Sequence, residues 1–241
     1  MAKYVKHDGV WKEPADSLRH DGVWKDKETW VKHNGIWKLV VEPFDSGPGP
    51  QEMQYDETTD TGYYGECSAD DLPSGDGLAY SMDLTAGYGI NSDAGWLKFY
   101  DQGKVLFVAK KPFRMAISWV DINNKNLVTG DEWYARDGYV YWVWLLSGGY
   151  HSPGTGSEWN RLIYRIHKDE PEDQEGDNWA TLGDADIVVG SGNGRETWCQ
   201  EQDGLYITVR GSSGLSDFLY VHQSNDSSAY GWRPVLELVQ E

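Results

Sequence analysis

His7-Asp8-Gly9-Val10-Trp11-Lys12 is the phrase that decides the architecture of the first part of the chain, because it recurs with a period of 13 residues. The other copies are His20-Asp21-Gly22-Val23-Trp24-Lys25 and His33-Asn34-Gly35-Ile36-Trp37-Lys38. Each copy centres on Asp-Gly or Asn-Gly, the dipeptides that best adopt the positive φ angles of a type I′ turn, and apolar and polar residues alternate on both sides. Residues 1–40 are therefore predicted to form a small all-β module of tandem hairpins.

A two-residue turn also fixes which residues oppose each other across each hairpin. It places Lys6 opposite Trp11, and it does the same with a basic residue and a Trp in the other two copies. A lone hairpin is marginally stable in water, so the aromatic faces need something to pack on. Three partners stay open: the rest of this chain, another protein and nucleic acid. The residues expected to make the contact are Tyr4, Trp11, Trp24, Trp30 and Trp37.

Composition limits the classes of partner. The chain of 241 residues holds 13 Trp and 15 Tyr against 5 Phe, a bias typical of contact surfaces that need both area and a polar group. Residues 1–40 carry eight Lys and Arg against six Asp and Glu, a net charge of +2, so the remaining 201 residues carry −20 of the total −18. An acidic body repels nucleic acid and anionic membranes. The longest apolar run is too short to span a membrane, and residues 1–20 lack the apolar stretch of a signal peptide.

A change of composition separates this module from the rest of the chain. Residues 41–50 are rich in Pro and Gly, and residues 51–61 stay polar and acidic. Pro-rich segments are extended and separate the units that they join. We therefore predict a linker over 41–61 and a second domain over 62–241, although a surface loop within one domain fits the same composition.

The second domain has the pattern of an α+β fold, with helices and strands mixed along the chain. Ser118 and Asp121 have the spacing of a capping box at the start of a short helix. Trp159, Leu162, Ile163 and Ile166 follow the spacing of an amphipathic helix. The other expected elements are a helical stretch from Asp70 towards Leu84, a hairpin over 96–108, a strand over 139–146, a long loop excursion over 170–230 and a closing strand over 232–238.

Several blocks of this domain resemble a domain of tailed-phage and prophage structural proteins, and the hairpin phrase resembles short repeats common in phage virion proteins. The ending Gly231-Trp232-Arg233-Pro234-Val235-Leu236-Glu237-Leu238 is the most specific block. The others, in chain order, are Gly62-Tyr63-Tyr64-Gly65-Glu66, Ala94-Gly95-Trp96-Leu97-Lys98-Phe99, Val108-Ala109-Lys110-Lys111-Pro112, Ile117-Ser118-Trp119, Asp121-Ile122-Asn123, Leu127-Val128-Thr129-Gly130, Leu145-Leu146-Ser147-Gly148-Gly149 and Glu158-Trp159-Asn160-Arg161-Leu162-Ile163.

The same domain resembles the C-type-lectin-like fold shared by formylglycine-generating enzymes and the variable proteins of diversity-generating retroelements. Gly231-Trp232-Arg233 corresponds to the signature that opens the closing strand of that fold. The resemblance implies ligand display from residues 212–230 just upstream. The enzymatic branch uses two cysteines close together in the C-terminal part, whereas Cys199 stands alone here, so no enzymatic activity is expected.

Aromatic residues interleaved with amide, carboxylate and imidazole groups suit sugar stacking or protein contact, although these aromatic residues suit a lectin-like core as well. The expected ligand-binding residues are Trp179, Trp198, Arg210, Asp217, Tyr220, His222, Asn225 and Tyr230.

No cofactor or metal is expected. The acidic run 169–177 offers oxygen ligands for Ca²⁺, but its spacing is not that of an EF-hand, and a solvated acidic loop explains it better. Cys67 and Cys199 fit no zinc or redox motif; they are either two buried thiols or one disulfide.

Together these observations predict a non-enzymatic protein located in the virion: a head fibre, a decoration protein, or an adhesin of the neck or tail. Its expected partners are other virion proteins, further copies of itself and a host-surface glycan or protein, with no nucleic acid and no membrane insertion. Two alternatives stay open, a purely structural joint of the particle and an enzyme of the formylglycine-generating type.

Overall fold

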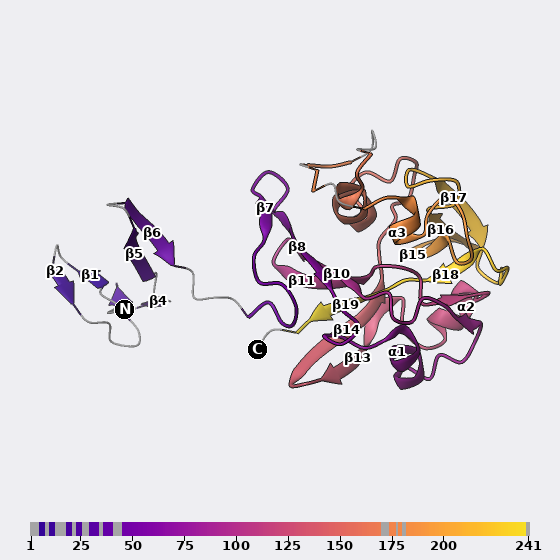
Figure 1. Cartoon of the computed structure of the whole chain (residues 1–241), viewed down its shortest axis with the longest axis horizontal. Coiled ribbons are helices and arrows are strands. Elements are labelled where there is room, and N and C mark those ends of the chain that lie inside the picture. Colours follow the sequence, from indigo (N-terminus) through magenta and orange to yellow (C-terminus); the bar gives the residue numbers. More distant parts are fainter. Residues whose placement is uncertain are drawn as a thin grey trace. The chain divides into compact units, whose positions relative to one another are not determined.

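The computed structural model describes two compact units, Met1–Ser46 and Gly47–Glu241 (Figure 1). In the first unit it describes the backbone of residues 5–7, 10–12, 18–20, 23–25, 29–33 and 36–40. From residue 45 onward it describes backbone and side chains of residues 45–169, 174–176, 178–179 and 182–239. Tyr4 and residues 41–44, which carried sequence-based expectations, lie outside the described residues.

The first unit contains three antiparallel hairpins, as the repeat predicts. The pairs are β1 (Val5–His7) with β2 (Val10–Lys12), β3 (Leu18–His20) with β4 (Val23–Lys25), and β5 (Thr29–His33) with β6 (Ile36–Val40). Each hairpin is a separate two-stranded sheet among the described residues. The predicted register is confirmed in every copy, with the pairs Lys6–Trp11, Arg19–Trp24 and Lys32–Trp37.

The second unit is a mixed α+β domain in which strands outnumber helices, and its larger sheet has seven antiparallel strands. Their order is β13-β14-β19-β11-β10-β8-β7 (Figure 1). The predicted hairpin around residues 101–104 and the predicted closing strand are confirmed as neighbours in this sheet. The bounds are β7 Gln54–Asp56, β8 Thr61–Cys67, β10 Trp96–Asp101, β11 Lys104–Ala109, β13 Thr129–Arg136, β14 Tyr139–Leu145 and β19 Pro234–Leu238.

The smaller sheet has six strands in the order β17-β16-β15-β18-β12-β9. Its strands are β9 Tyr88–Gly89, β12 Arg114–Met115, β15 Glu196–Asp203, β16 Tyr206–Arg210, β17 Phe218–His222 and β18 Tyr230–Trp232. The expected loop excursion over 170–230 is therefore wrong for β15, β16 and β17. The Gly, Ser and Asp residues that suggested a loop lie mostly in the turns, while β16 itself is a run of aromatic and β-branched residues.

The helices are short. They are α1 (Gly75–Ser81), α2 (Trp119–Asn123) and α3 (Asp184–Ile187). The predicted capping box of α2 is confirmed, since Ser118 and Asp121 each accept a hydrogen bond from the other's backbone N–H. The predicted amphipathic helix is instead a π-helical turn, Trp159–Ile163, followed by a 3₁₀ turn, Tyr164–Ile166. Nearly all of its side chains are buried, so it has no polar face.

Two hydrophobic clusters hold the second unit together, one on each face of the seven-stranded sheet. Because side chains alternate along a strand, Phe107 of β11 enters the cluster shared with the six-stranded sheet and with α1 and α2. Leu106 and Val108 enter the other cluster, which the Trp159–Ile166 segment covers. The sheet is thus buried on both faces over its central strands.

The second unit begins earlier than the sequence analysis predicts, since residues 47–61 belong to it. Lys98 of β10 is buried, and its Nζ donates to the carbonyl oxygens of Pro48 (2.9 Å) and Pro50 (2.7 Å). The following residues form β7, which pairs with β8. The Pro/Gly segment is therefore fixed to the domain at its C-terminal end, because its carbonyl groups meet a cation that lies inside the domain.

Both cysteines are free and buried. Of the two alternatives, the structure therefore contains two buried thiols and not a disulfide. Burial raises the pKa of Cys67 to about 12 and raises the pKa of Cys199 well above its usual value. No helix among the described residues is long and apolar enough to cross a membrane.

Candidate functional site

The structure divides the eight expected ligand-binding residues into a buried group and a surface group. Trp179, Trp198 and Arg210 are buried. The other five are partly or largely exposed: Asp217, Tyr220, His222, Asn225 and Tyr230. The expectation of a binding surface made by all eight residues is therefore corrected to a smaller site.

The two buried tryptophans are core residues. The indole N–H of Trp198 donates to the carbonyl of Ile117 (2.8 Å), and its ring stacks on that of Tyr230 with 4.8 Å between centroids. Trp179 lies against Tyr63, with the guanidinium of Arg165 at 3.7 Å from the centre of a Trp179 ring. Neither indole is available to a ligand in solution.

Arg210 is buried and fixes a loop instead of binding a ligand. Its Nη1 donates to the carbonyl oxygens of Gly148 (3.0 Å) and Pro153 (3.0 Å), and its Nη2 donates to the hydroxyl of Tyr164. The carboxylate of Asp217 accepts a hydrogen bond from the backbone N–H of Ser213 and shapes the turn before β17. Arg210 thus connects the loop 147–157 to β16.

Exposed side chains of β16 and β17 form an aromatic face at one end of these two strands. Tyr206 opposes His222 across the two strands, and their rings meet edge to face with 5.9 Å between centroids. Tyr220 lies two residues before His222 and therefore on the same face of the strand. All three side chains are exposed, and we refer to Tyr206, Tyr220 and His222 as the β16–β17 face. β17 is the edge strand of its sheet (Figure 1).

The loop 147–157 covers the remainder of this sheet face and borders the site. Thr208 donates its hydroxyl proton to the carbonyl of Gly149 (2.9 Å), and the carboxylate of Glu201 accepts from the backbone N–H groups of Gly148 and Gly149, each at 2.8 Å. The loop carries Tyr150, of which 62% is exposed.

Charged and polar groups near the loop 147–157 affect the pKa of Tyr220 in the β16–β17 face. The pKa of Tyr220 is raised, first by partial burial and then by the charges of Asp203 and Glu201 and the hydroxyl of Tyr150. The Tyr220 hydroxyl therefore stays protonated and can donate a hydrogen bond over the whole physiological pH range. An exposed aromatic ring with a hydroxyl donor can stack on a polyhydroxylated ligand and donate a hydrogen bond to it.

Amide side chains border the site near the turn that follows β17. Gln202 Nε2 donates to Gln223 Oε1 (3.2 Å), and the backbone N–H of Gln223 donates to the carbonyl of Leu205 (2.9 Å). Asn225 Nδ2 donates to the hydroxyl of Tyr230 (3.3 Å). These contacts hold the turn after β17 in place while leaving the side chain of Asn225 exposed.

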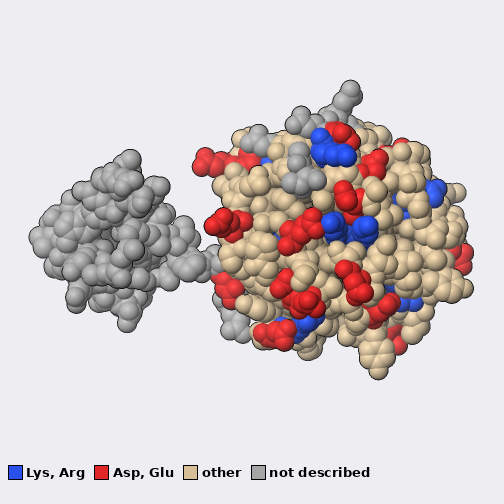
Figure 2. All heavy atoms as spheres, viewed as in Figure 1, with Lys and Arg blue, Asp and Glu red and all other residues tan. Residues whose placement is uncertain are grey.

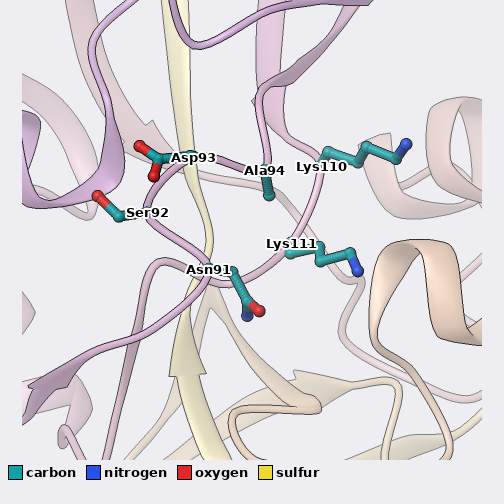
Figure 3. Close-up of a pocket in the computed structure, with 6 residues that line it drawn as sticks. All are labelled: Asn91, Ser92, Asp93, Ala94, Lys110 and Lys111. Carbon is teal, nitrogen blue, oxygen red and sulfur yellow. The ribbon is translucent and has the colours of Figure 1, made fainter.

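A separate open pocket of about 440 Å³ lies between residues 91–94 and 110–111 (Figure 3). In Figure 3 the carboxylate of Asp93 points away from the two lysines. Lys110 Nζ is paired with Glu66 (2.6 Å). The lining of this pocket is polar and contains no aromatic ring, so it lacks the stacking surface of the β16–β17 face.

Metal ligands do not gather among the described residues, where no three His, Cys, Asp or Glu side chains come together. Only Asp169 and residues 174–176 of the acidic run 169–177 are described. Figure 2 shows Asp and Glu side chains spread over one face of the second unit, with Lys and Arg between them. The face drawn in Figure 2 shows no continuous stripe of Lys and Arg among the described residues.

Comparison with protein-family models, with characterised proteins and with solved structures finds no match.

Three candidate residues were missed by the sequence analysis. Tyr150 belongs to the β16–β17 site through the fold alone, and no local signal marks it. Trp133 and Trp142 oppose each other on β13 and β14 and are exposed by 57% and 39%. Residues 139–145 form a continuous run of aromatic and apolar residues, so the sequence does not show which of these side chains face outward.

Proposed function

We propose that this chain is a non-enzymatic structural protein of a tailed-phage particle, attached by its hairpin module and displaying the Gly47–Glu241 unit towards a host-surface glycan or protein. The proposal rests on the observation that the chain consists of two different parts in succession. Three tandem hairpins each place a basic residue opposite a Trp, and they precede a separately folded acidic domain with an open aromatic face. A hairpin alone is marginal, so the module favours a permanent partner.

The proposed lectin-like character of the second unit is supported by its closing segment. Gly231-Trp232-Arg233 leads directly into β19, and Arg233 is fully buried. Its guanidinium donates to the carbonyl of Lys110 (2.8 Å), the hydroxyl of Thr197 (3.2 Å) and the carbonyl of Ile187. The signature arginine thus connects both sheets to α3, a role that explains why the segment needs this residue type.

The proposal that the chain is not an enzyme has support in the setting of Cys199. The thiol is buried, and its pKa is raised by burial, whereas a reactive cysteine needs an accessible thiolate. We expect no oxidase activity in the presence of added copper. Turnover that is lost in Cys199→Ser but not in Cys67→Ser would contradict this part of the proposal.

The test of the whole proposal compares particles that carry the full chain, a chain lacking residues 47–241, and a chain in which Trp11, Trp24 and Trp37 are changed to Ala. We expect the truncated chain to remain on particles that assemble normally but adsorb poorly. The triple variant is expected to be absent from purified particles although the protein is made. Particles that fail to assemble with the truncated chain would favour a structural joint, and retention of the triple variant would overturn the anchoring role.

A further inference from the structure

The outer face of β13 and β14 carries exposed aromatic side chains at the edge of the seven-stranded sheet. Trp133 and Trp142 are direct cross-strand partners and project from this face, as do Ala135 and Val140, which form the next pair. The inward residues of β14, Tyr141 and its alternates, belong to the core. We refer to Trp133 and Trp142 as the tryptophan strip.

The row of cross-strand partners that contains Trp133 and Trp142 continues to a carboxylate on the next strand. Glu237 of β19 pairs with Trp142 on the side opposite Trp133, so an acceptor lies at one end of the strip. Lys104 is 3.1 Å from this carboxylate and also lies 4.4 Å from the centre of a Trp144 ring. Lys104 is therefore already paired with a carboxylate, and it offers little to an anionic ligand.

The size of the strip indicates the kind of ligand. Taking about 250 Å² for a whole Trp side chain, exposures of 57% and 39% leave about 240 Å² of indole surface for contact. A specific protein interface needs about 800 Å² on each partner. The strip is too small for a protein partner and has the dimensions of a few sugar rings.

Register and charge narrow the class further. Trp133 and Trp142 are partners across two strands that lie about 4.8 Å apart, so one extended ligand can reach both indoles. The electron-rich faces of the indoles attract the C–H faces of a pyranose. The carboxylate of Glu237, which pairs with Trp142, repels phosphate and carboxylate groups while accepting hydroxyl protons.

We propose that the tryptophan strip is a second binding site, distinct from the β16–β17 face, for a neutral polysaccharide in an extended conformation. Two successive sugar units lie on Trp133 and Trp142, and a hydroxyl group donates to Glu237. The site does not depend on attachment of the protein to a particle. It adds a polymer-binding surface to the unit that the proposed function displays.

The test is affinity electrophoresis of the full chain in native gels containing dextran, mannan, hydroxyethylcellulose or, as a polyanion, hyaluronan. We expect retardation by at least one neutral polymer and none by hyaluronan. Trp133→Ala and Trp142→Ala should each raise the apparent dissociation constant at least tenfold. The conservative changes Trp133→Tyr and Trp142→Tyr should retain most of the binding, which guards against loss through misfolding.

Two control variants separate this site from others. Tyr80→Ala removes an aromatic residue that is 89% exposed on α1 and should not change the retardation. Tyr220→Ala removes part of the β16–β17 face and shows whether the polymer binds there instead. If Tyr220→Ala abolishes it and the Trp changes do not, the strip is not the site, although the proposed function stands. No retardation by any neutral polymer, or self-association that Trp142→Ala abolishes, would overturn the inference.

Discussion

Glu158 is a carboxyl group that the fold holds largely out of water at the base of the loop 147–157. Its Oε2 accepts a hydrogen bond from the backbone N–H of Ser147 (2.8 Å), and its own N–H donates to Ser147 Oγ (2.8 Å). Burial raises the pKa of Glu158 from 4.5 to about 7, and the nearby carboxylate of Asp101 adds to the increase. The Ser147 hydrogen bond and Arg161 act in the opposite direction and do not offset the burial.

The sign of the effect on stability follows from this direction. The folded protein holds the Glu158 proton more tightly than the unfolded chain, so folding binds a proton between pH 4.5 and about 7. The contribution is fully present below pH 4.5 and is lost as pH rises through about 7. At about 1.4 kcal/mol per pKa unit, the loss amounts to about 3 kcal/mol.

Glu158→Gln removes the ionisation while keeping an oxygen that can accept from Ser147. We expect the variant to have nearly the stability of the parent at pH 4.5 and to be more stable than the parent by up to about 3 kcal/mol at pH 8.5. The measurement is the free energy of unfolding of the second unit in urea at several pH values. Glu52→Gln, at an exposed position, is the matched control and should leave the pH dependence unchanged. A difference between Glu158→Gln and the parent that is the same at both pH values would refute the reasoning.

Three further predictions test the assignments of buried and exposed residues. Lys98→Met should cost about 3 kcal/mol, because it leaves buried carbonyl oxygens without a donor, and it should open the Pro/Gly segment before β7 to limited proteolysis. Trp198→Ala should cost about 3–5 kcal/mol in urea unfolding, whereas Tyr220→Ala should cost less than about 0.5 kcal/mol; similar losses would contradict the division into core and surface. Cys67 and Cys199 should react with a thiol reagent only after unfolding, and rapid reaction of the native protein would show that the thiols are accessible.

The hairpin module was predictable in detail because its signal is local. An Asp-Gly pair selects a type I′ turn, and the turn fixes the register of both strands. The turn between β13 and β14 is also an Asp-Gly pair with positive φ angles, 52° at Asp137 and 88° at Gly138. Local turn preference therefore transfers from one part of the chain to another without any tertiary context.

The smaller sheet was not predictable by the same means. β15 contacts β18 in parallel over two residue pairs, and β12 and β9 are two residues long. Strands this short carry no periodic pattern, and their pairing depends on segments that are far apart in the sequence. The composition of the intervening turns dominated the prediction of a loop, although β16 and β17 alone have strand-like sequences.

The positions of the tryptophans in the structure show why composition alone cannot locate a binding site in this chain. An indole buried in a Gly-rich β domain needs an acceptor, and irregular segments supply free carbonyl groups. Trp96 donates to Pro73, Trp119 donates to Cys199, and Trp159 donates to Leu215, each at 3.0 Å. A Trp beside Gly, Ser and Asp residues is therefore as well suited to the interior as to the surface. What separates the two cases is the position in the sheet: Tyr141 and Val143, the neighbours of Trp142 along β14, enter the core, and Trp142 lies on the opposite face, where it stays 39% exposed.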